Sequence, residues 1–256
     1  MTVKYNYQHK VVLITGAASG FGKLAAQAFA QSGAKLALID INQAALTLSV
    51  EEFRANNIEA IGLRCDISQN ESVKAAIAQV KQHFGHLDIA INNAGIIHPM
   101  ARLADSEERD FDRTISINLK GTFLCMKHEL TLMQTQGHGV ILNTASVSGL
   151  IGSPFLSIYS AAKHGVIGLT RSAALEYGRK GIRINAICPT FAHTPMLDNI
   201  VDGKGDDFTD KLAASLPMQR LAEPEEVVKA MLWLCSDDNS FMNGAAVTVD
   251  GGLTAG

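Results

Sequence analysis

A tyrosine and a lysine, Tyr159 and Lys163, stand four residues apart in a segment with helical periodicity. In a helix this spacing places the phenol and the ammonium group on one face. A free tyrosine has a pKa of about 10 and is a poor base at neutral pH, but a nearby cation lowers the pKa of a phenol by about 1–3 units. A tyrosine with a lowered pKa can act as a general base and take a proton from an alcohol. A surface tyrosine stacked on a lysine stem is the competing interpretation of the pair alone.

Polar residues follow two apolar segments that we predict to be strands. Asn92-Asn93-Ala94-Gly95 follows one segment, and Asn143-Thr144-Ala145-Ser146 follows the other. Ligands of open α/β sheets bind outside the carboxyl ends of the strands. These residues are therefore candidates for a ligand site, and Tyr159 comes thirteen residues after Ser146.

A glycine-rich turn follows the first apolar segment and opens directly into a helical pattern. Residues 15–22 have the sequence Thr-Gly-Ala-Ala-Ser-Gly-Phe-Gly. Glycines let the chain turn tightly and approach a pyrophosphate, and the helix start offers free N–H groups to that anion. Three glycines in a turn that binds nothing are the alternative, but the strand before and the helix after favour a dinucleotide. The candidate cofactor-binding residues of the turn are Gly16, Ser19, Gly20, Phe21 and Gly22.

Asp40 ends the second predicted strand, where its carboxylate can accept hydrogen bonds from both ribose hydroxyls of an adenosine. The same charge repels a 2′-phosphate, and neither residues 15–22 nor residues 41–42 contain a lysine or arginine to compensate. The predicted cofactor is therefore NAD. An aspartate that only caps the next helix is the alternative. Asp66, after the third strand, is placed to meet the adenine amino group, and taken alone it is a helix cap.

The composition narrows the class of protein. The chain has 256 residues, of which 47% are hydrophobic and 18% charged, with a formal net charge of −3. Neither nucleic acid nor an anionic membrane is an expected partner. The four scattered cysteines form no C-x-x-C pair, so we expect buried thiols and no metal site. No apolar run reaches about 18 residues and residues 1–10 lack a signal-peptide core, so the predicted location is the cytoplasm.

Short apolar segments alternate with helical patterns along the whole chain, which predicts βαβ units and a doubly wound parallel sheet of the Rossmann type with about seven strands. The nearly continuous apolar character of the strands suits burial on both faces. We expect one domain over residues 1–256. The predicted strands include 11–14, 36–39, 89–91, 140–142, 182–187 and 246–249, and the helical patterns cover 22–31, 44–55, 71–84, 109–133 and 159–177.

Together these motifs resemble the short-chain dehydrogenase/reductase family over residues 10–252. The resemblance implies that Tyr159 is the general acid/base and that Ser146 donates a hydrogen bond to the substrate oxygen. It implies that Lys163 holds the nicotinamide ribose and lowers the pKa of Tyr159, and that Asn118 anchors a water that feeds protons to Lys163. The matching residues are 15–22, Asp66, 92–95, Asn118, Ser146, Tyr159, Lys163, Asn185, Pro189 and 250–252.

The resemblance also implies a set of residues that hold NAD outside the glycine-rich turn. Three positions depart from the usual family pattern: Phe21 replaces Ile, Thr190 replaces Gly, and Ala192 replaces Val or Ile. Thr190 is bulkier than glycine, so it affects the backbone conformation beside the nicotinamide and, with it, the access of the substrate. The implied set is Asp40, Ile41, Asp66, Ile67, Asn92, Ala94, Gly95, Thr144, Tyr159, Lys163, Pro189, Thr190, Ala192 and Thr194.

Residues 190–216 show no clear periodicity, and we expect them to form a lid over the substrate. The segment is acidic, with five aspartates against two lysines, so it suits a carboxylate or phosphopantetheine substrate poorly. Its apolar residues, with Ile96, Ile97, Met100, Leu150, Ile151 and Phe155, indicate either an apolar pocket or ordinary core packing. The chain is similar to family members that oxidise cyclic secondary alcohols and ring diols. His98 and His193 receive no role.

The predicted function is hydride transfer between NAD(H) and an apolar cyclic or bulky secondary alcohol or its ketone. An NADPH-dependent 3-oxoacyl thioester reductase is the main alternative, and Asp40 speaks against it. A non-catalytic dinucleotide-binding protein is the second alternative, but it would be expected to lack Ser146, Tyr159 or Lys163. The resemblance implies a homotetramer, which agrees with apolar positions in excess on helices 109–133 and 159–177 and on strand 246–249.

Overall fold

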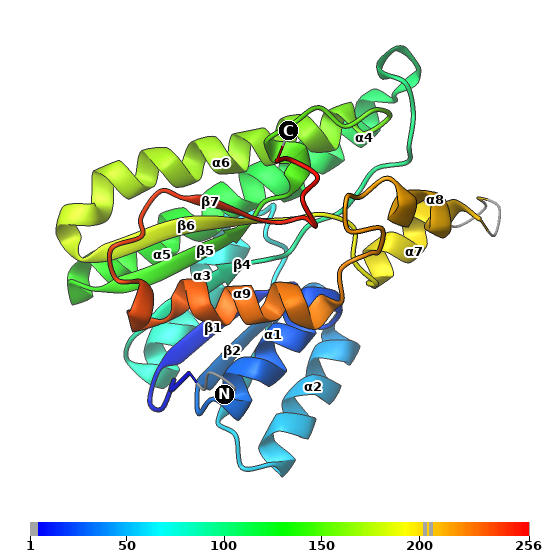
Figure 1. The fold of residues 1–256 in the computed structure, drawn as a ribbon. Helices are drawn as coiled ribbons and strands as arrows, with labels where there is room; N and C mark the ends of the chain where they lie inside the picture. The colour runs from blue at the N-terminus through cyan, green and yellow to red at the C-terminus, as the bar shows by residue number, and fades with distance from the viewer. Residues whose placement is uncertain (1–4, 202–203, 205–206, 256) are drawn as a thin grey trace.

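Seven parallel strands form one sheet in the order β3-β2-β1-β4-β5-β6-β7 (Figure 1). The computed structural model describes residues 5–201, 204 and 207–255. The strand order reverses between β1 and β4, the point at which open α/β sheets bind ligands. The strands are β1 (Val11–Thr15), β2 (Lys35–Asp40), β3 (Ala60–Arg64), β4 (Ile89–Asn92), β5 (Gly139–Thr144), β6 (Ile182–Pro189) and β7 (Ala246–Val249).

Helices cover both faces of this sheet (Figure 1). One layer holds α1 (Gly20–Gln31), α2 (Gln43–Ala55) and α9 (Pro224–Cys235), and the other holds α3 (Asn70–Phe84), α5 (Thr122–Gln136) and α6 (Ser157–Tyr177). The remaining helical segments are α4 (Glu108–Thr114), α7 (Pro195–Val201), α8 (Phe208–Ala214), the π-helix η2 (Ile115–Gly121) and the 3₁₀ turns η1 (Leu103–Asp105), η3 (Val147–Gly149), η4 (Gly178–Lys180) and η5 (Asp237–Asn239).

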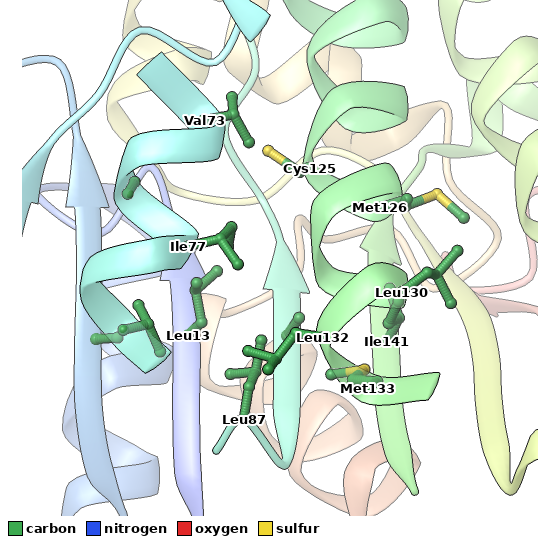
Figure 2. Close-up of a cluster of buried hydrophobic side chains, with 14 of the residues drawn as sticks. Leu13, Val73, Ile77, Leu87, Cys125, Met126, Leu130, Leu132, Met133 and Ile141 are labelled. Carbon is green, nitrogen blue, oxygen red and sulfur yellow. The ribbon is translucent and has the colours of Figure 1, made fainter. Parts of the chain in front are cut away.

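The core has two parts, one on each face of the sheet. Because side chains alternate along a strand, Leu13 of β1 packs with α3 and α5, while Ile14 packs with the layer of α1 and α9. Figure 2 shows the first part, in which Ile77 of α3 and Leu132 of α5 lie over the sheet. Burial on both faces explains why the β1 sequence is apolar at four consecutive positions.

The predicted fold class is confirmed, and the structure adds two details to the predicted elements. The pattern over 109–133 is helical but is divided into α4, η2 and α5, because the wider π turn shifts the helical period. Residues 190–216 contain α7 and α8, whose seven residues each are too few to show a periodic pattern. Asp202 and Asp206 of the predicted lid lie outside the described residues.

A chain of buried polar side chains joins the carboxyl ends of β4 and β5 to helices α5 and α6. Glu129 is fully buried, and its Oε2 accepts a hydrogen bond of 3.0 Å from the Asn92 amide. Asn92 also donates to Asn143 at 3.0 Å, and Asn143 donates to Thr170 at 2.9 Å. Burial raises the pKa of Glu129 to about 8, so this carboxyl is largely neutral at physiological pH.

The four cysteines are buried, as predicted, and each is a free thiol in the structure. Burial raises the pKa of each thiol, most strongly for Cys125 and Cys235. Across the described part of the chain, no helix is long and apolar enough to cross a membrane, and no cluster of three His, Cys, Asp or Glu side chains is placed to hold a metal ion.

Candidate active site

The glycine-rich turn joins β1 to α1, and its glycines are required either by the backbone angle or by close packing. Gly16 and Gly20 have φ angles of +65° and +51°, in the left-handed region. A Cβ on Gly22 would lie 2.1 Å from the carbonyl oxygen of Gly16. Ser19 is the N-cap of α1 and its side chain makes no capping hydrogen bond. The turn therefore presents backbone N–H groups at the start of α1, the arrangement that binds a pyrophosphate.

Asp40 braces this turn from the end of β2. Its Oδ2 accepts the N–H of Ala18 at 3.0 Å, and its Oδ1 accepts the N–H of Asn42 at 2.9 Å. The cap of α2 is Asn42, so the interpretation of Asp40 as a mere helix cap is wrong. Each carboxylate oxygen keeps a lone pair for a further donor. Asp66 accepts the backbone N–H and the hydroxyl of Ser68 at 2.9 and 2.7 Å, before α3 begins.

Asn118 lies in the π-helix η2 and is fully buried. Its side chain accepts the N–H of Ile96 and donates to the carbonyl of Ile96, both at 2.8 Å. A Cβ on Gly95 would lie 3.2 Å from Asn118 Oδ1 and 3.7 Å from Lys163 Nζ. The glycine therefore lets both side chains come close to the main chain at position 95. Asn118 thus fixes the main chain after β4 beside Lys163. The water that Asn118 is expected to anchor stays a prediction.

Tyr159 and Lys163 occupy the first two turns of α6 and are both buried. Lys163 Nζ donates to the carbonyl of Thr144 at 2.6 Å and lies 5.5 Å from the centroid of the Tyr159 ring. Burial lowers the pKa of Lys163 to about 8. Burial also raises the pKa of Tyr159 to about 12, against the opposing effect of the Ser146 hydroxyl. The predicted lowering of the tyrosine pKa is therefore wrong for the chain alone, because loss of water outweighs the hydrogen bond from Ser146.

Ser146 follows β5 and faces the same cavity as Tyr159 and Lys163. Its Oγ accepts the N–H of Ser148 at 3.1 Å, and its hydroxyl lies 3.5 Å from the carbonyl oxygen of Pro189, a long contact for a hydrogen bond. The main chain therefore holds the Ser146 proton only weakly, and the proton can turn toward a substrate oxygen beside Tyr159.

The cavity has a volume of about 360 Å³ and lies between the carboxyl edge of the sheet and the lid helices. Met196, Leu197 and Ile200 of α7 line it, as do Ile97, Met100 and Ile151, so these predicted pocket residues are placed together. Ile96, Leu150 and Phe155 are not among its lining residues. His98 is buried outside the lining, and His193 is exposed. A larger cavity of about 750 Å³ lies at the opposite edge of the sheet, around Asp88 and His138, away from this chemistry.

Sequence reasoning missed three side chains of this region. Ser148 and Ser153 line the cavity, and their hydroxyl oxygens are 2.7 Å apart. Ser148 stands two residues after Ser146, a proximity that could have drawn attention to it. Glu129 gave no signal, because a glutamate in a helix that also carries Lys127 and Gln134 looks like a solvated residue until the fold is known.

Comparison with known proteins identifies the family. A family model described as enoyl-(acyl carrier protein) reductase matches residues 16–254. The 2,5-dichloro-2,5-cyclohexadiene-1,4-diol dehydrogenase of Sphingobium indicum is 42% identical over 247 residues, which cover 96% of this chain and 97% of that protein. The cyclohexanol dehydrogenase of an Acinetobacter species is 39% identical over 255 residues, covering 100% and 98%. The crystal structure of levodione reductase matches with a TM-score of 0.94 at 38% identity, covering 98% of this chain and 99% of that one.

The chain belongs to the short-chain dehydrogenase/reductase family. Members of the family are oxidoreductases that use NAD(H) or NADP(H), and the predicted membership is confirmed.

The site of this short-chain dehydrogenase/reductase fits such a dinucleotide. The cradle at Gly16 and Gly22 leaves no room for a Cβ beside the backbone that would approach the pyrophosphate. Farther along the carboxyl edge, the hydroxyls of Thr144 and Thr190 are buried without a hydrogen-bond partner in the described residues. Polar atoms of this kind are costly unless a ligand or water satisfies them. Both threonines belong to the set predicted to hold the cofactor.

Proposed function

We propose that this protein transfers a hydride between NAD(H) and a secondary alcohol or its ketone, with an apolar cyclic or bulky substrate. The observation that carries the proposal is that Ser146, Tyr159 and Lys163 line one largely apolar cavity beside the glycine-rich turn. A bound nicotinamide supplies or accepts the hydride.

The side chains of the chain itself handle the proton and the substrate oxygen. Ser146 donates a hydrogen bond to that oxygen and keeps its proton, since a lone pair of its Oγ already accepts the N–H of Ser148. Tyr159 gives a proton to the oxygen in reduction and takes it in oxidation. With a pKa of about 8, Lys163 is mostly charged at neutral pH and stabilises the phenolate formed in reduction. Asn118 keeps the backbone of Ile96 in place beside this pair.

The proposed cofactor is NAD, on the strength of Asp40. Its carboxylate accepts hydrogen bonds from the ribose hydroxyls, and against NADP it faces a phosphate. Charge-assisted hydrogen bonds to the ribose of NAD contribute roughly 1.5–3 kcal/mol, and repulsion of the NADP phosphate adds to this difference. Together they correspond to about a hundredfold preference or more for NAD over NADP. Specificity constants for NAD and NADP with one alcohol measure it. Asp40→Ala should reduce the preference for NAD over NADP by weakening the binding of NAD. The additional substitution Ile41→Arg should reduce the preference further, because arginine binds the phosphate of NADP. Equal constants in the wild type would refute this choice.

The proposed substrate class rests on the lining of the cavity. Lys163 is the one charged side chain among its described lining residues, and the carbonyl of Thr144 already engages it. A phosphate or carboxylate would therefore find no free cation there. The relatives named above act on ring compounds, which agrees with the apolar lining of this cavity. Cyclohexanol oxidation and reduction of an acetoacetyl thioester should be compared. A higher specificity constant for the thioester would favour the 3-oxoacyl reductase instead.

The proposed assembly is a homotetramer with twofold symmetry. Large apolar side chains are exposed on two separate faces: Phe123 on α5 with Leu175 on α6, and Trp233 on α9 with Phe241 near β7. Two distinct self-complementary interfaces generate such a tetramer. Light scattering should give four chains per particle at micromolar concentration, and a monomer would contradict the proposal.

A further inference from the structure

Two hydroxyls in the cavity wall have no place in the mechanism above. Ser148 belongs to η3 and is buried, and Ser153 is half-buried in the loop before α6. Both line the cavity that holds Ser146 and Tyr159. We propose that this hydroxyl pair binds a second neutral oxygen on the substrate ring, so that the protein prefers ring diols and hydroxyketones to simple ring alcohols. The inference rests on the proposed function and names its substrate more closely.

The backbone of Ser148 holds the pair in a fixed position relative to Ser146. The N–H of Ser148 donates to Ser146 Oγ at 3.1 Å, and the carbonyl of Ser148 accepts the hydroxyl of Ser160 at 2.7 Å. These bonds involve the main chain of Ser148 and leave its side chain out. The hydroxyl pair and the Ser146 hydroxyl are therefore two separate polar points in the same cavity wall, linked through the main chain of Ser148.

Counting protons shows that the pair has one to offer. The two hydroxyl oxygens are 2.7 Å apart, and the bond between them uses one of their two protons, whichever residue donates. No acceptor among the described residues takes the second proton. Ser215, another serine of the cavity lining, differs because its hydroxyl donates to the carbonyl of Leu212.

The surroundings select the chemistry of the second group. A serine hydroxyl both donates and accepts, so it suits an alcohol or a ketone oxygen. A carboxylate would need a cation, and Lys163 is engaged by Thr144. A simple ring alcohol would cover the pair with carbon and leave its proton unpaired, which penalises such a substrate. The apolar remainder of the wall accommodates the ring itself.

The test compares two substrates on each protein preparation, so that any inactive fraction cancels. Specificity constants with NAD are measured for cis-cyclohexane-1,2-diol and for cyclohexanol, in the wild type, in the double variant Ser148→Ala/Ser153→Ala and in the control Ser215→Ala. We expect the diol-to-alcohol ratio to fall about tenfold in the double variant, as befits one hydrogen bond, and to stay unchanged in Ser215→Ala. An unchanged ratio in the double variant would overturn the proposal.

A binding measurement separates this inference from the proposed function. Calorimetric titration of the NAD-saturated protein with each ring compound requires no turnover. If neither compound is oxidised, the proposed function fails, but tighter binding of the diol that disappears in Ser148→Ala/Ser153→Ala still supports the hydroxyl pair. Equal affinities of the wild type for the two compounds overturn the pair's role, whether or not either is oxidised.

Discussion

The two halves of the sheet build their parts of the site by different means. The half from β1 to β3 presents a glycine-rich turn, and the Asp40 bond to Ala18 spans only 22 residues. The half from β4 to β7 relies on buried polar side chains that meet across long separations, such as Asn92 and Asn143, which are 51 residues apart. The first half depends on the shape of the backbone. The second depends on satisfying polar groups within the core, where each unpaired atom costs free energy.

The comparison predicts different failures in the two halves. A substitution in the first should act by steric clash, because a Cβ on Gly22 meets backbone. A substitution in the second should act through protons and hydrogen bonds, because Tyr159, Lys163 and Glu129 are all buried titratable groups. The three variants below test this division.

The largest effect is expected for Tyr159→Phe in the catalytic half. Removal of the hydroxyl deletes the proton donor and keeps the ring, so kcat should fall by about 10²–10⁴-fold, the usual contribution of general acid/base catalysis. Affinity for NAD should stay close to that of the wild type, because the variant leaves the cradle at Gly16 intact. Steady-state rates and a cofactor titration measure the two quantities. A variant that keeps more than about a tenth of the wild-type rate would place the acid/base elsewhere.

In the first half, Gly22→Ala should destabilise the fold by about 4 kcal/mol, at the upper end for a single substitution. The new Cβ would lie 2.1 Å from a backbone oxygen, which no side-chain adjustment relieves. The matched control is Gly20→Ala in the same turn, where the nearest atoms lie 3.9 Å away and only the φ of +51° is unfavourable. That control should cost about 1–2 kcal/mol. Denaturant titrations compare the two, and equal losses would show that strain, not clash, governs the turn.

The smallest effect, and the one that distinguishes the halves by pH, is expected for Glu129→Gln. The pKa of Glu129 is raised from 4.5 to about 8 in the folded protein, so the folded state binds this proton more tightly than the unfolded state does. Its contribution to stability is therefore complete below pH 4.5 and is lost as the pH rises toward 8. Between pH 5 and 7 the wild type should lose on the order of 2–3 kcal/mol from this group.

The glutamine variant should lack that loss, because an amide does not titrate, and it keeps an acceptor for Asn92. Free energies of unfolding at pH 5 and pH 7, measured for both proteins, give the difference directly. The same pH dependence in the variant and the wild type would mean that Glu129 is ionised in the fold.

The sequence was sufficient to predict the parts of the molecule that depend on local order. Apolar strands, the turn at residues 15–22 and the spacing of Tyr159 and Lys163 are visible in short stretches of sequence, and the structure places them as predicted. The pKa of Tyr159 was predicted in the wrong direction, because burial is set by distant segments that close over α6. The Glu129 chain and the Ser148 hydroxyl pair depend on contacts that only the folded chain creates.

The buried cysteines have a practical consequence for labelling the protein. Thiol reagents react with exposed thiolates, and here all four thiols are both covered and shifted to higher pKa. The native cysteines should therefore react slowly, at a rate that reports opening of the fold. A cysteine introduced at the exposed His193, next to α7, would then be the one fast-reacting position. A fluorophore attached there would report on the surroundings of α7 without removal of any native residue in the core.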